Sequence, residues 1–255
     1  MAEVSLSLVK ELALQAGEIA LARFLHVQPS LKPGDELVTR ADREIEAFLV
    51  SRLREAYPEH GILGEELGIS VEGKECLWAL DPIDGTRAFA SGLPVWGISI
   101  GLLERGRPTR GVFYMPLLRE CYYVDAQGEA FWNDRPLARL SGDSWNVNAL
   151  LCVPSDAHRR YDIRFSGVTR AMGSTAANII YVARGTAVGA LIGRPHLWDI
   201  AVALAILERV GGLVCYLSGK PVELSLLLDG RTAPEPMLAA PPDLLQPLLK
   251  EIKVR

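Results

Sequence analysis

Apolar side chains recur at helical spacing along the first quarter of the chain. Over residues 5–24 they predict a largely buried first helix, because its centre is apolar on nearly every side. A break that contains Pro and Gly follows at residues 29–34. Thr39 and Asp42 then have the spacing of a helix start, and the apolar stripe after them predicts a second helix that ends at Pro58.

The segments that follow have the pattern of β-strands. Two short apolar runs, GILGEE at residues 61–66 and CLWALDPID at residues 76–84, end in carboxylates, which is typical of strands whose ends reach a functional site. From residue 96 to about residue 140, partly alternating apolar runs are separated by the turn signals ERGRP and DAQG. This region therefore predicts an antiparallel meander.

The second half alternates helix and strand, as α/β layers do. We predict a junction near residues 140–145, which divides the chain into an N-terminal half, residues 1–140, and a C-terminal half, residues 141–255. In the C-terminal half the pattern predicts helices at 174–184, 199–210 and 243–252 and a strand at 187–193.

Composition and charge exclude several classes of protein. The 255 residues are 49% hydrophobic and 23% charged, which is the composition of a folded globular chain rather than a disordered one. The formal charge of -4 provides no basic footprint for nucleic acid. No apolar run reaches the roughly 20 residues that span a bilayer, and Glu3 is acidic where a signal peptide is basic, so we expect a cytoplasmic protein without a membrane partner.

The cysteines and histidines do not form recognisable ligand sets. The chain has four cysteines in mostly apolar surroundings and no CxxC pair, which predicts reduced, buried thiols rather than a zinc site or disulfides: Cys76, Cys121, Cys152 and Cys215. The four histidines have no ligand-like spacing, and we expect them to pack or to lie at the surface: His26, His60, His158 and His196.

The segment LDPIDGT is the densest group of candidate chemical residues. Side chains three apart on a straight strand point to opposite faces, so Asp81 and Asp84 converge only if the chain turns between them. Pro82 and Gly85 can supply that turn, which would also free the carbonyl of Ile83. Two carboxylates and a carbonyl are hard oxygen ligands suited to Mg²⁺ or Mn²⁺. The same residues are also the commonest ones in a plain β-turn.

Other acidic residues can likewise be interpreted either as metal ligands or catalytic groups or as ordinary structural residues. Glu65 and Glu66 could be a solvated loop pair, Asp199 a helix cap, and Asp42 one residue of a capped helix. The spacing of an EF-hand is absent. The acids of DPIDGT are three residues apart rather than two, which excludes the DxDx(T/V) pattern of phosphatases that form an aspartyl phosphate.

Five segments together resemble one family. They occur in that family's order and approximate spacing: VTRAD (38–42), ILGEE (62–66), WALDPIDGTRAF (78–89), MGSTAAN (172–178) and LWDIAVALAILERVGG (197–212). Over nearly its whole length the chain resembles the inositol monophosphatase family of Mg²⁺-dependent, lithium-sensitive phosphatases. The resemblance implies a five-layer α-β-α-β-α sandwich, an N-terminal α+β half, a C-terminal α/β half and a homodimer.

The resemblance also implies a set of metal ligands. Glu65, Asp81 and the carbonyl of Ile83 would hold one Mg²⁺, and Asp81, Asp84 and Asp199 would hold a second. Glu65 would help with a third ion, and Mn²⁺ could replace Mg²⁺. The charges agree with this assignment, because a dianionic phosphate ester is repelled by carboxylates unless divalent cations reverse the local charge.

Catalytic and phosphate-binding residues follow from the same resemblance. Asp42 and Thr86 would orient the attacking water, with Glu65 in a catalytic role beside them. Gly85 and Thr86 would offer main-chain N–H groups to the phosphate, and Ser174 would belong to the same phosphate site. Water would displace the leaving group in line, without a covalent intermediate.

The substrate is harder to predict. In inositol-type members an acidic residue lies seven positions before the aspartate that matches Asp199, and here that position is Ile192, which could offer only apolar contact. Arg87 and the run SGLPVWG (91–97) resemble a histidinol-phosphate branch, whereas MGSTAAN (172–178) resembles the inositol or sugar-phosphate branch. Arg87 is either a surface charge or a contact to substrate or partner.

We therefore expect a Mg²⁺-dependent phosphomonoesterase that acts on a small phosphorylated polyol or sugar of the inositol monophosphate type. Histidinol phosphate and fructose 1,6-bisphosphate are the alternative substrates. A regulatory binding partner is the alternative that is not an enzyme. It is disfavoured because every candidate ligand is intact.

Overall fold

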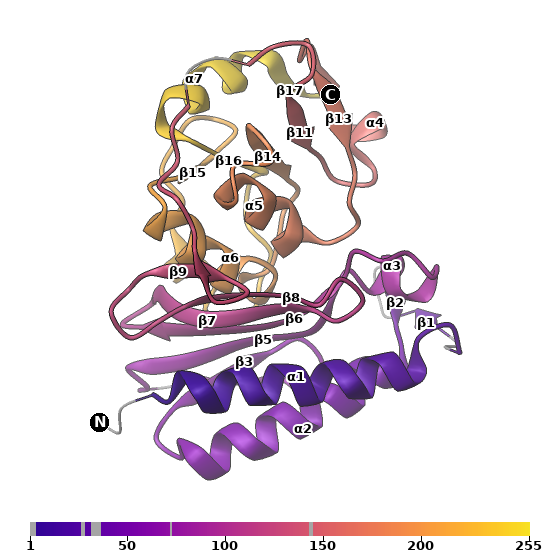
Figure 1. Cartoon of the computed structure of the whole chain (residues 1–255), viewed down its shortest axis with the longest axis vertical. Coiled ribbons are helices and arrows are strands. Elements are labelled where there is room, and N and C mark those ends of the chain that lie inside the picture. The colour runs from indigo at the N-terminus through magenta and orange to yellow at the C-terminus, as the bar shows by residue number, and fades with distance from the viewer. Residues whose placement is uncertain (1–3, 27–28, 32–36, 72, 143–144) are drawn as a thin grey trace.

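The computed structural model describes residues 4–26, 29–31, 37–71, 73–142 and 145–255, and these residues form five layers (Figure 1). Two helices cover one face of an eight-stranded sheet, two more separate it from a five-stranded sheet, and a fifth covers the far side of that sheet. The five are, in that order, α1 (Leu6–Arg23), α2 (Arg40–Ala56), α5 (Thr175–Ala183), α6 (Leu197–Arg209) and α7 (Pro242–Glu251). The predicted five-layer α-β-α-β-α sandwich is confirmed.

The first sheet contains the predicted meander. Its strands, from one edge to the other, are β10 (Arg135–Pro136), β9 (Ala130–Trp132), β8 (Glu120–Val124), β7 (Arg107–Met115), β6 (Gly97–Glu104), β5 (Cys76–Asp84), β3 (Gly61–Gly64) and β4 (Ile69–Ser70). Neighbouring strands are antiparallel except β3 and β5, which are parallel. β3 and β5 run in the same direction, so their C-terminal ends lie at the same end of the sheet. Glu65 directly follows β3 and Asp84 is the last residue of β5, so both lie at that end.

The second sheet is smaller and mixed. Its order is β13 (Val168–Arg170), β11 (Leu150–Cys152), β14 (Gly189–Ile192), β16 (Met237–Ala240) and β15 (Leu213–Tyr216). The remaining pairs are β1 (Ser30–Leu31) with β2 (Leu37–Val38) and β12 (Tyr161–Ile163) with β17 (Ile252–Val254). Three short helical segments complete the fold: α3 (Thr86–Ala90), α4 (Ala157–Arg160) and the 3₁₀ turn η1 (Leu224–Leu227).

Parts of three expectations lie outside the described residues, namely Glu3, residues 32–34 of the predicted break, and residues 143–144 at the predicted junction. Among the described residues, no helix is both long and apolar enough to cross a membrane.

The helix starts follow the local signals in the sequence. Ser5 caps α1 by accepting a hydrogen bond from the Leu8 N–H, and Thr39 and Asp42 form a capping box at the start of α2. The Ser174 hydroxyl caps α5. These caps fix where each helix begins and therefore where the polar side chains of its first turn lie.

The predicted turn between Asp81 and Asp84 is a bulge within a strand. β5 continues to Asp84, and its pairing with β6 shifts register between these two residues. An irregularity of this kind breaks the strict alternation of side chains. Both carboxylates can therefore face the same side although they are three residues apart.

Close packing places α6 against the first sheet. Every residue from Ile200 to Leu207 is buried. Gly101 in β6 leaves room for the helix, since a Cβ at that position would lie 2.8 Å from the Cβ of Ala201. This contact fixes the distance between the first sheet and the first turn of α6, which carries Asp199.

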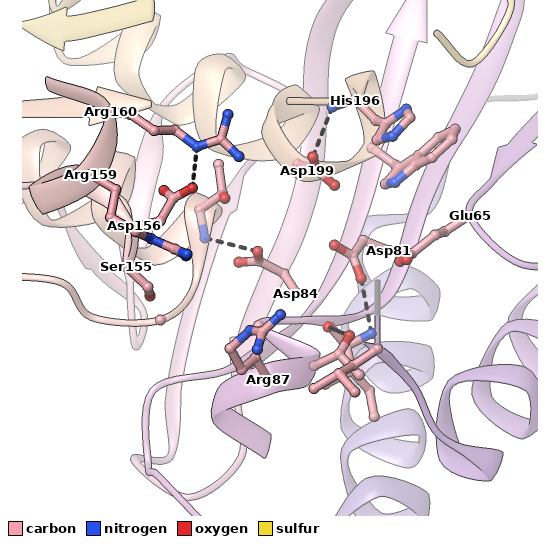
Figure 2. Close-up of a pocket in the computed structure, with 17 residues that line it drawn as sticks. Glu65, Asp81, Asp84, Arg87, Ser155, Asp156, Arg159, Arg160, His196 and Asp199 are labelled. Carbon is pink, nitrogen blue, oxygen red and sulfur yellow. Dashed lines mark hydrogen bonds and ion pairs between the residues drawn. The ribbon is translucent and has the colours of Figure 1, made fainter. Parts of the chain in front are cut away.

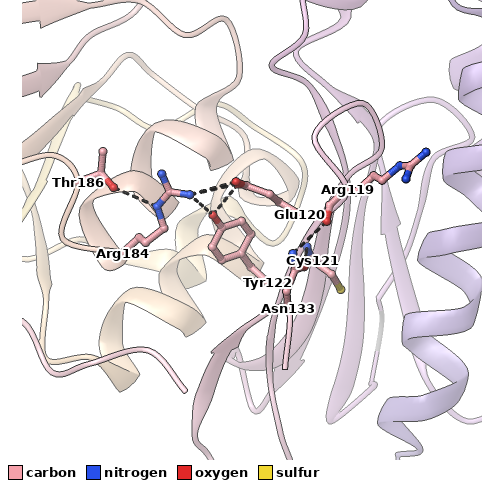
Figure 3. Close-up of polar contacts among 7 residues, drawn as sticks. All are labelled: Arg119, Glu120, Cys121, Tyr122, Asn133, Arg184 and Thr186. Atoms are coloured by element: carbon pink, nitrogen blue, oxygen red, sulfur yellow. Dashed lines mark hydrogen bonds and ion pairs between the residues drawn. The ribbon is translucent and has the colours of Figure 1, made fainter. Parts of the chain in front are cut away.

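A polar contact also links α5 to the first sheet (Figure 3). Arg184, at the end of α5, donates to the two carboxylate oxygens of Glu120 at 3.1 and 3.3 Å and to the hydroxyl of Tyr122 at 3.0 Å. Tyr122 in turn donates to Glu120 at 2.7 Å. The side chains of Arg184 and Glu120 are only 22% and 18% exposed, so this ion pair is better shielded than an ordinary surface pair.

Candidate active site

A cavity of about 910 Å³ opens where β5 ends, and it is lined by residues from both halves of the chain (Figure 2). Four carboxylates that the sequence singled out lie in its wall. Glu65 follows β3, Asp81 and Asp84 flank the bulge in β5, and Asp199 is the third residue of α6. The fold thus brings together acids that are up to 134 positions apart in the sequence, from residue 65 to residue 199.

Asp81 lies at the electrostatic centre of this cluster. Its side chain is 3% exposed, and it accepts a hydrogen bond from the Ile83 N–H at 3.0 Å. Burial raises the pKa of Asp81 well above its usual value, and the negative charges of Glu65, Asp84 and Asp199 raise it further. A positive charge placed among these groups would therefore be strongly favoured.

Asp84 is held by the start of α5. Its carboxylate accepts hydrogen bonds from the main-chain N–H groups of Thr175 and Ala176, both at 2.9 Å, and from the hydroxyl of Ser174. These bonds favour the ionised form, but burial outweighs them and raises the pKa of Asp84 to about 6. Ser174 is itself 1% exposed, so in this structure it contacts Asp84 rather than lining the cavity.

Asp42 is fully buried and reaches the cavity through Thr86. It accepts hydrogen bonds from the N–H and the hydroxyl of Thr39, at 2.8 and 2.6 Å, and lies 3.2 Å from the hydroxyl of Thr86. The Thr86 hydroxyl is also 3.1 Å from the carbonyl oxygen of Ile83, so its single proton has two acceptors. Burial raises the pKa of Asp42 to about 6 in spite of the hydrogen bonds from Thr39.

Gly85 makes the turn from β5 into α3. Its φ of 95° lies in the left-handed region, which glycine adopts without strain. A Cβ at this position would also lie 2.9 Å from the carbonyl oxygen of Gly173. The glycine is therefore required by the close approach of two chain segments at the cavity wall as well as by the turn.

Glu46 supports the site, although it belongs to none of the sequence motifs. This residue of α2 is fully buried and accepts hydrogen bonds from the N–H groups of Glu66 and Leu67 at 2.7 and 2.8 Å. It thereby holds the loop that carries Glu65. Burial raises the pKa of Glu46 to about 7. A charged residue beside Ile45 in the apolar stripe of the helix was the signal that could have identified it.

His196 was expected only to pack or to lie at the surface, but it also lines the cavity. Its ring stacks on Trp198 with 4.4 Å between ring centroids, and its Nδ1 lies 2.8 Å from the carbonyl oxygen of Gly230. The main-chain N–H of His196 donates a hydrogen bond to the Asp199 carboxylate at 2.8 Å, which orients that carboxylate.

A second group of lining residues came from a segment for which the sequence made no prediction. Ser155, Asp156, Arg159 and Arg160 all belong to α4 or directly precede it. A helix of four residues has no periodicity to detect, so the pattern of the sequence carried no signal here.

The sequence profile of the inositol monophosphatase family matches residues 2–252. The chain belongs to this family. An inositol-1-monophosphatase from Mesorhizobium japonicum is 34% identical over 231 residues, which cover 84% of this chain and 86% of the relative. A fructose-1,6-bisphosphatase/inositol-1-monophosphatase from Thermotoga maritima is 36% identical over 193 residues, 72% of this chain and 73% of the relative. Among solved structures, an IMPase from Thermotoga maritima has a TM-score of 0.83 at 28% identity, with 96% of this chain and 95% of that chain covered.

Members of the inositol monophosphatase family are metal-dependent phosphatases that act on small phosphate esters, so the chain is a phosphoric monoester hydrolase. The chemistry of the pocket fits a hard divalent cation. Its candidate donors are the four carboxylates and the carbonyl of Ile83, all of them oxygen atoms. Burial, and after it the neighbouring negative charges, raise the pKa of Asp81, and a bound cation would offset both effects.

The described residues do not form a closed metal site as they stand. Within that part of the chain, no three His, Cys, Asp or Glu side chains are grouped closely enough to hold an ion. Two of the candidates are instead turned toward main-chain donors, Asp84 toward α5 and Asp199 toward the His196 N–H. Their donor chemistry therefore fits a metal, whereas binding would require a rearrangement of these side chains.

Ile192 lies in the hydrophobic core and not in the wall of the cavity. It pairs with Met237 between β14 and β16, is 3% exposed and packs in the hydrophobic core. The walls of the cavity are formed by other residues. Ile192 therefore provides the cavity with neither a carboxylate nor an apolar wall.

Proposed function

We propose that this phosphatase uses Mg²⁺ to hydrolyse the phosphate monoester of a small polyol or sugar by direct attack of water. The observation that carries the proposal is the convergence of Glu65, Asp81, Asp84 and Asp199 on one cavity beside the carbonyl of Ile83. The hard oxygen donors and the mutual repulsion of the carboxylates favour Mg²⁺, with Mn²⁺ as a possible substitute.

In this proposal Glu65, Asp81 and the carbonyl of Ile83 hold one ion, and Asp81, Asp84 and Asp199 hold a second. Glu65 would also contribute to a third. The ions would offset the charge of the carboxylates and the phosphate and would make water a better nucleophile at neutral pH. The pKa of Asp84, about 6, leaves this carboxyl mostly ionised above neutral pH, which is the form that binds metal.

We assign the positioning of the attacking water to Thr86. The Asp42 carboxylate lies 3.2 Å from the Thr86 hydroxyl and is mostly ionised above pH 6. It can therefore accept a hydrogen bond from that hydroxyl. The oxygen of Thr86 is then free to accept a hydrogen bond from water. Asp42, which is fully buried, acts through Thr86 as a positioning residue. Glu65, which lines the cavity directly, is the proposed general base.

Phosphate binding is assigned to the turn at the end of β5. The left-handed conformation of Gly85 begins α3, and the main-chain N–H groups of Gly85 and Thr86 would face the phosphate. Ser174 would support the phosphate site through its hydrogen bond to Asp84. A homodimer, a cytoplasmic location and the absence of a nucleic-acid partner stay predictions.

The names of two relatives support a polyol or sugar phosphate as substrate. One relative is named for inositol-1-phosphate chemistry and another for both this chemistry and fructose 1,6-bisphosphate. Fructose 1,6-bisphosphate is therefore the second candidate. Histidinol phosphate stays an alternative because of the resemblance of residues 91–97 to that branch.

The test is phosphate release from inositol 1-phosphate, fructose 1,6-bisphosphate, histidinol phosphate and adenosine 3′,5′-bisphosphate, with Mg²⁺ or with EDTA. We expect Mg²⁺-dependent release and a loss of several orders of magnitude in kcat/KM for Asp81→Asn, since the uncatalysed reaction is extremely slow. Asp162→Asn is the matched control, because its side chain is 51% exposed and outside the cavity. Normal turnover of Asp81→Asn at saturating Mg²⁺ would refute the assignment.

A further inference from the structure

The cavity carries a basic side that the hydrolysis proposed above does not use. Arg87 from α3 and Arg159 and Arg160 from α4 line it together with the four candidate metal ligands and Asp156. In Figure 2 the arginines lie on the side of Asp84 that is away from Glu65. The cavity is therefore polarised, with Glu65, Asp81 and Asp199 on one side and the three guanidinium groups, together with Asp156, on the other.

Two of the three arginines are available to a ligand. Arg160 forms an ion pair with Asp156, which precedes it by one helical turn. Within the described part of the chain, Arg87 and Arg159 have no carboxylate partner, and both are exposed. Their guanidinium groups retain all their hydrogen-bond donors for an anion.

Arg87 and Arg159 come from different halves of the molecule and meet at one cavity. Two like charges that line the same cavity repel one another, and an anion between them removes that repulsion. Each guanidinium can also bind a phosphate through two parallel N–H donors. One exposed arginine at the cavity could be an ordinary surface charge. Two from separate elements at the same cavity are better explained by a shared ligand.

The size of the cavity agrees with an elongated ligand. Its 910 Å³ lies near the upper end of the roughly 300–1,000 Å³ of pockets that enclose drug-sized molecules, and this is far more than one phosphate group needs. A ligand with its reacting phosphate at the acidic side would extend toward the arginines.

We propose that Arg87 and Arg159 bind a second phosphate group of the substrate, so that the preferred substrate is a bisphosphate. This inference rests on the proposed function, because it assigns the reacting phosphate to the acidic side of the cavity. A phosphorylated sugar and a nucleoside bisphosphate share this chemistry and are distinguished by the arms of the test.

The test compares matched pairs of esters that differ only in the second phosphate. The sugar pair is fructose 1,6-bisphosphate and fructose 1-phosphate, and the nucleotide pair is adenosine 3′,5′-bisphosphate and adenosine 3′-phosphate. For each pair, kcat and KM are measured with Mg²⁺ for the wild type, Arg87→Gln, Arg159→Gln and the double variant. Arg164→Gln is the matched control, because this arginine is 71% exposed and outside the cavity.

We expect the wild type to prefer the bisphosphate of at least one pair by about 10-fold or more in kcat/KM, since charge-assisted hydrogen bonds are the stronger class. The double variant should lose this preference, mainly through a higher KM for the bisphosphate. Arg159→Lys should retain more of it than Arg159→Gln, and Arg164→Gln should retain all of it. Added salt should weaken the preference in the wild type.

The outcomes separate this inference from the proposed function. Mg²⁺-dependent release from the monophosphates without a preference that depends on the arginines would overturn the bisphosphate site and leave the phosphatase assignment intact. Equal losses for both members of a pair would also overturn it. No release from any ester would overturn both proposals. The pair that shows the preference identifies the leaving group as a sugar or a nucleoside.

Discussion

We expect the metal-free protein to lose stability as the pH rises from 5 to 8, because Asp42, Glu46 and Asp84, in addition to Asp81, are buried carboxyls with raised pKa values. Burial raises the pKa of Asp42 and Asp84 from 3.8 to about 6, and that of Glu46 from 4.5 to about 7. The three side chains are at most 3% exposed. Between about pH 4 and pH 7 the folded protein therefore holds protons that the unfolded chain has released, so a rise in pH favours unfolding.

The size of the effect follows from these shifts. A shift of one pKa unit corresponds to about 1.4 kcal/mol. Part of the loss in the free energy of unfolding that each raised pKa causes is already present at pH 5. From pH 5 to pH 8 the linkage amounts to roughly 1.4 kcal/mol for each aspartate and roughly 2.5 kcal/mol for Glu46. The sum of about 5 kcal/mol corresponds to a fall in Tm of roughly 10–20 °C for a chain of this size.

The assay is thermal unfolding in EDTA from pH 5 to pH 8, repeated with Mg²⁺. Mg²⁺ should raise Tm mainly at the alkaline end, where the carboxylates are ionised and can bind it. Glu46→Gln should reduce the pH dependence by about half, whereas Glu59→Gln should not change it, because the side chain of Glu59 is 93% exposed. A Tm in EDTA that stays constant or rises toward pH 8 would refute this reasoning.

Three substitutions test individual contacts. Ser174→Ala removes the hydroxyl that donates to Asp84 and caps α5, and urea denaturation should show a loss of about 1–2 kcal/mol in the free energy of unfolding. Arg184→Met keeps much of the apolar stem but leaves Glu120 without this partner, and the same measurement should show a loss of about 1–3 kcal/mol. Gly85→Ala places a Cβ 2.9 Å from a main-chain oxygen at positive φ, and kcat should fall at least about 10-fold while the circular dichroism spectrum is retained.

The sequence was most informative where a local signal determines the structure. The capping residue Thr39, for example, predicted the start of α2, and the long apolar patterns predicted the five long helices in outline. Strands of two or three residues, such as β4 and β10, are too short for a detectable alternation. The bulge in β5 was expected as a turn, because the sequence cannot show that pairing with β6 resumes at Asp84.

The candidate site was predictable in its acids but not in its surroundings. The segment around Asp81 carries its own chemical signature, whereas the role of Glu46 depends on main-chain donors 20 and 21 positions away. The burial of Ile192 could not be predicted, for a related reason. Its position relative to Asp199 along the chain suggested a place at the cavity, but packing between β14 and β16 buries it in the core. Distances along the sequence do not specify which side of a strand faces a cavity.

The position of the acids between the layers links catalysis to the assembly of the whole fold. Asp84 belongs to the first sheet, but its hydrogen-bond donors are at the start of α5, so the same contacts orient a candidate metal ligand and fix a helix of the C-terminal half. Asp199 approaches the cavity only because α6 packs closely on Gly101 of β6. A substitution that separates these layers should therefore reduce metal binding before it unfolds either sheet, even when it lies far from the cavity, because the four carboxylates converge only while both contacts persist.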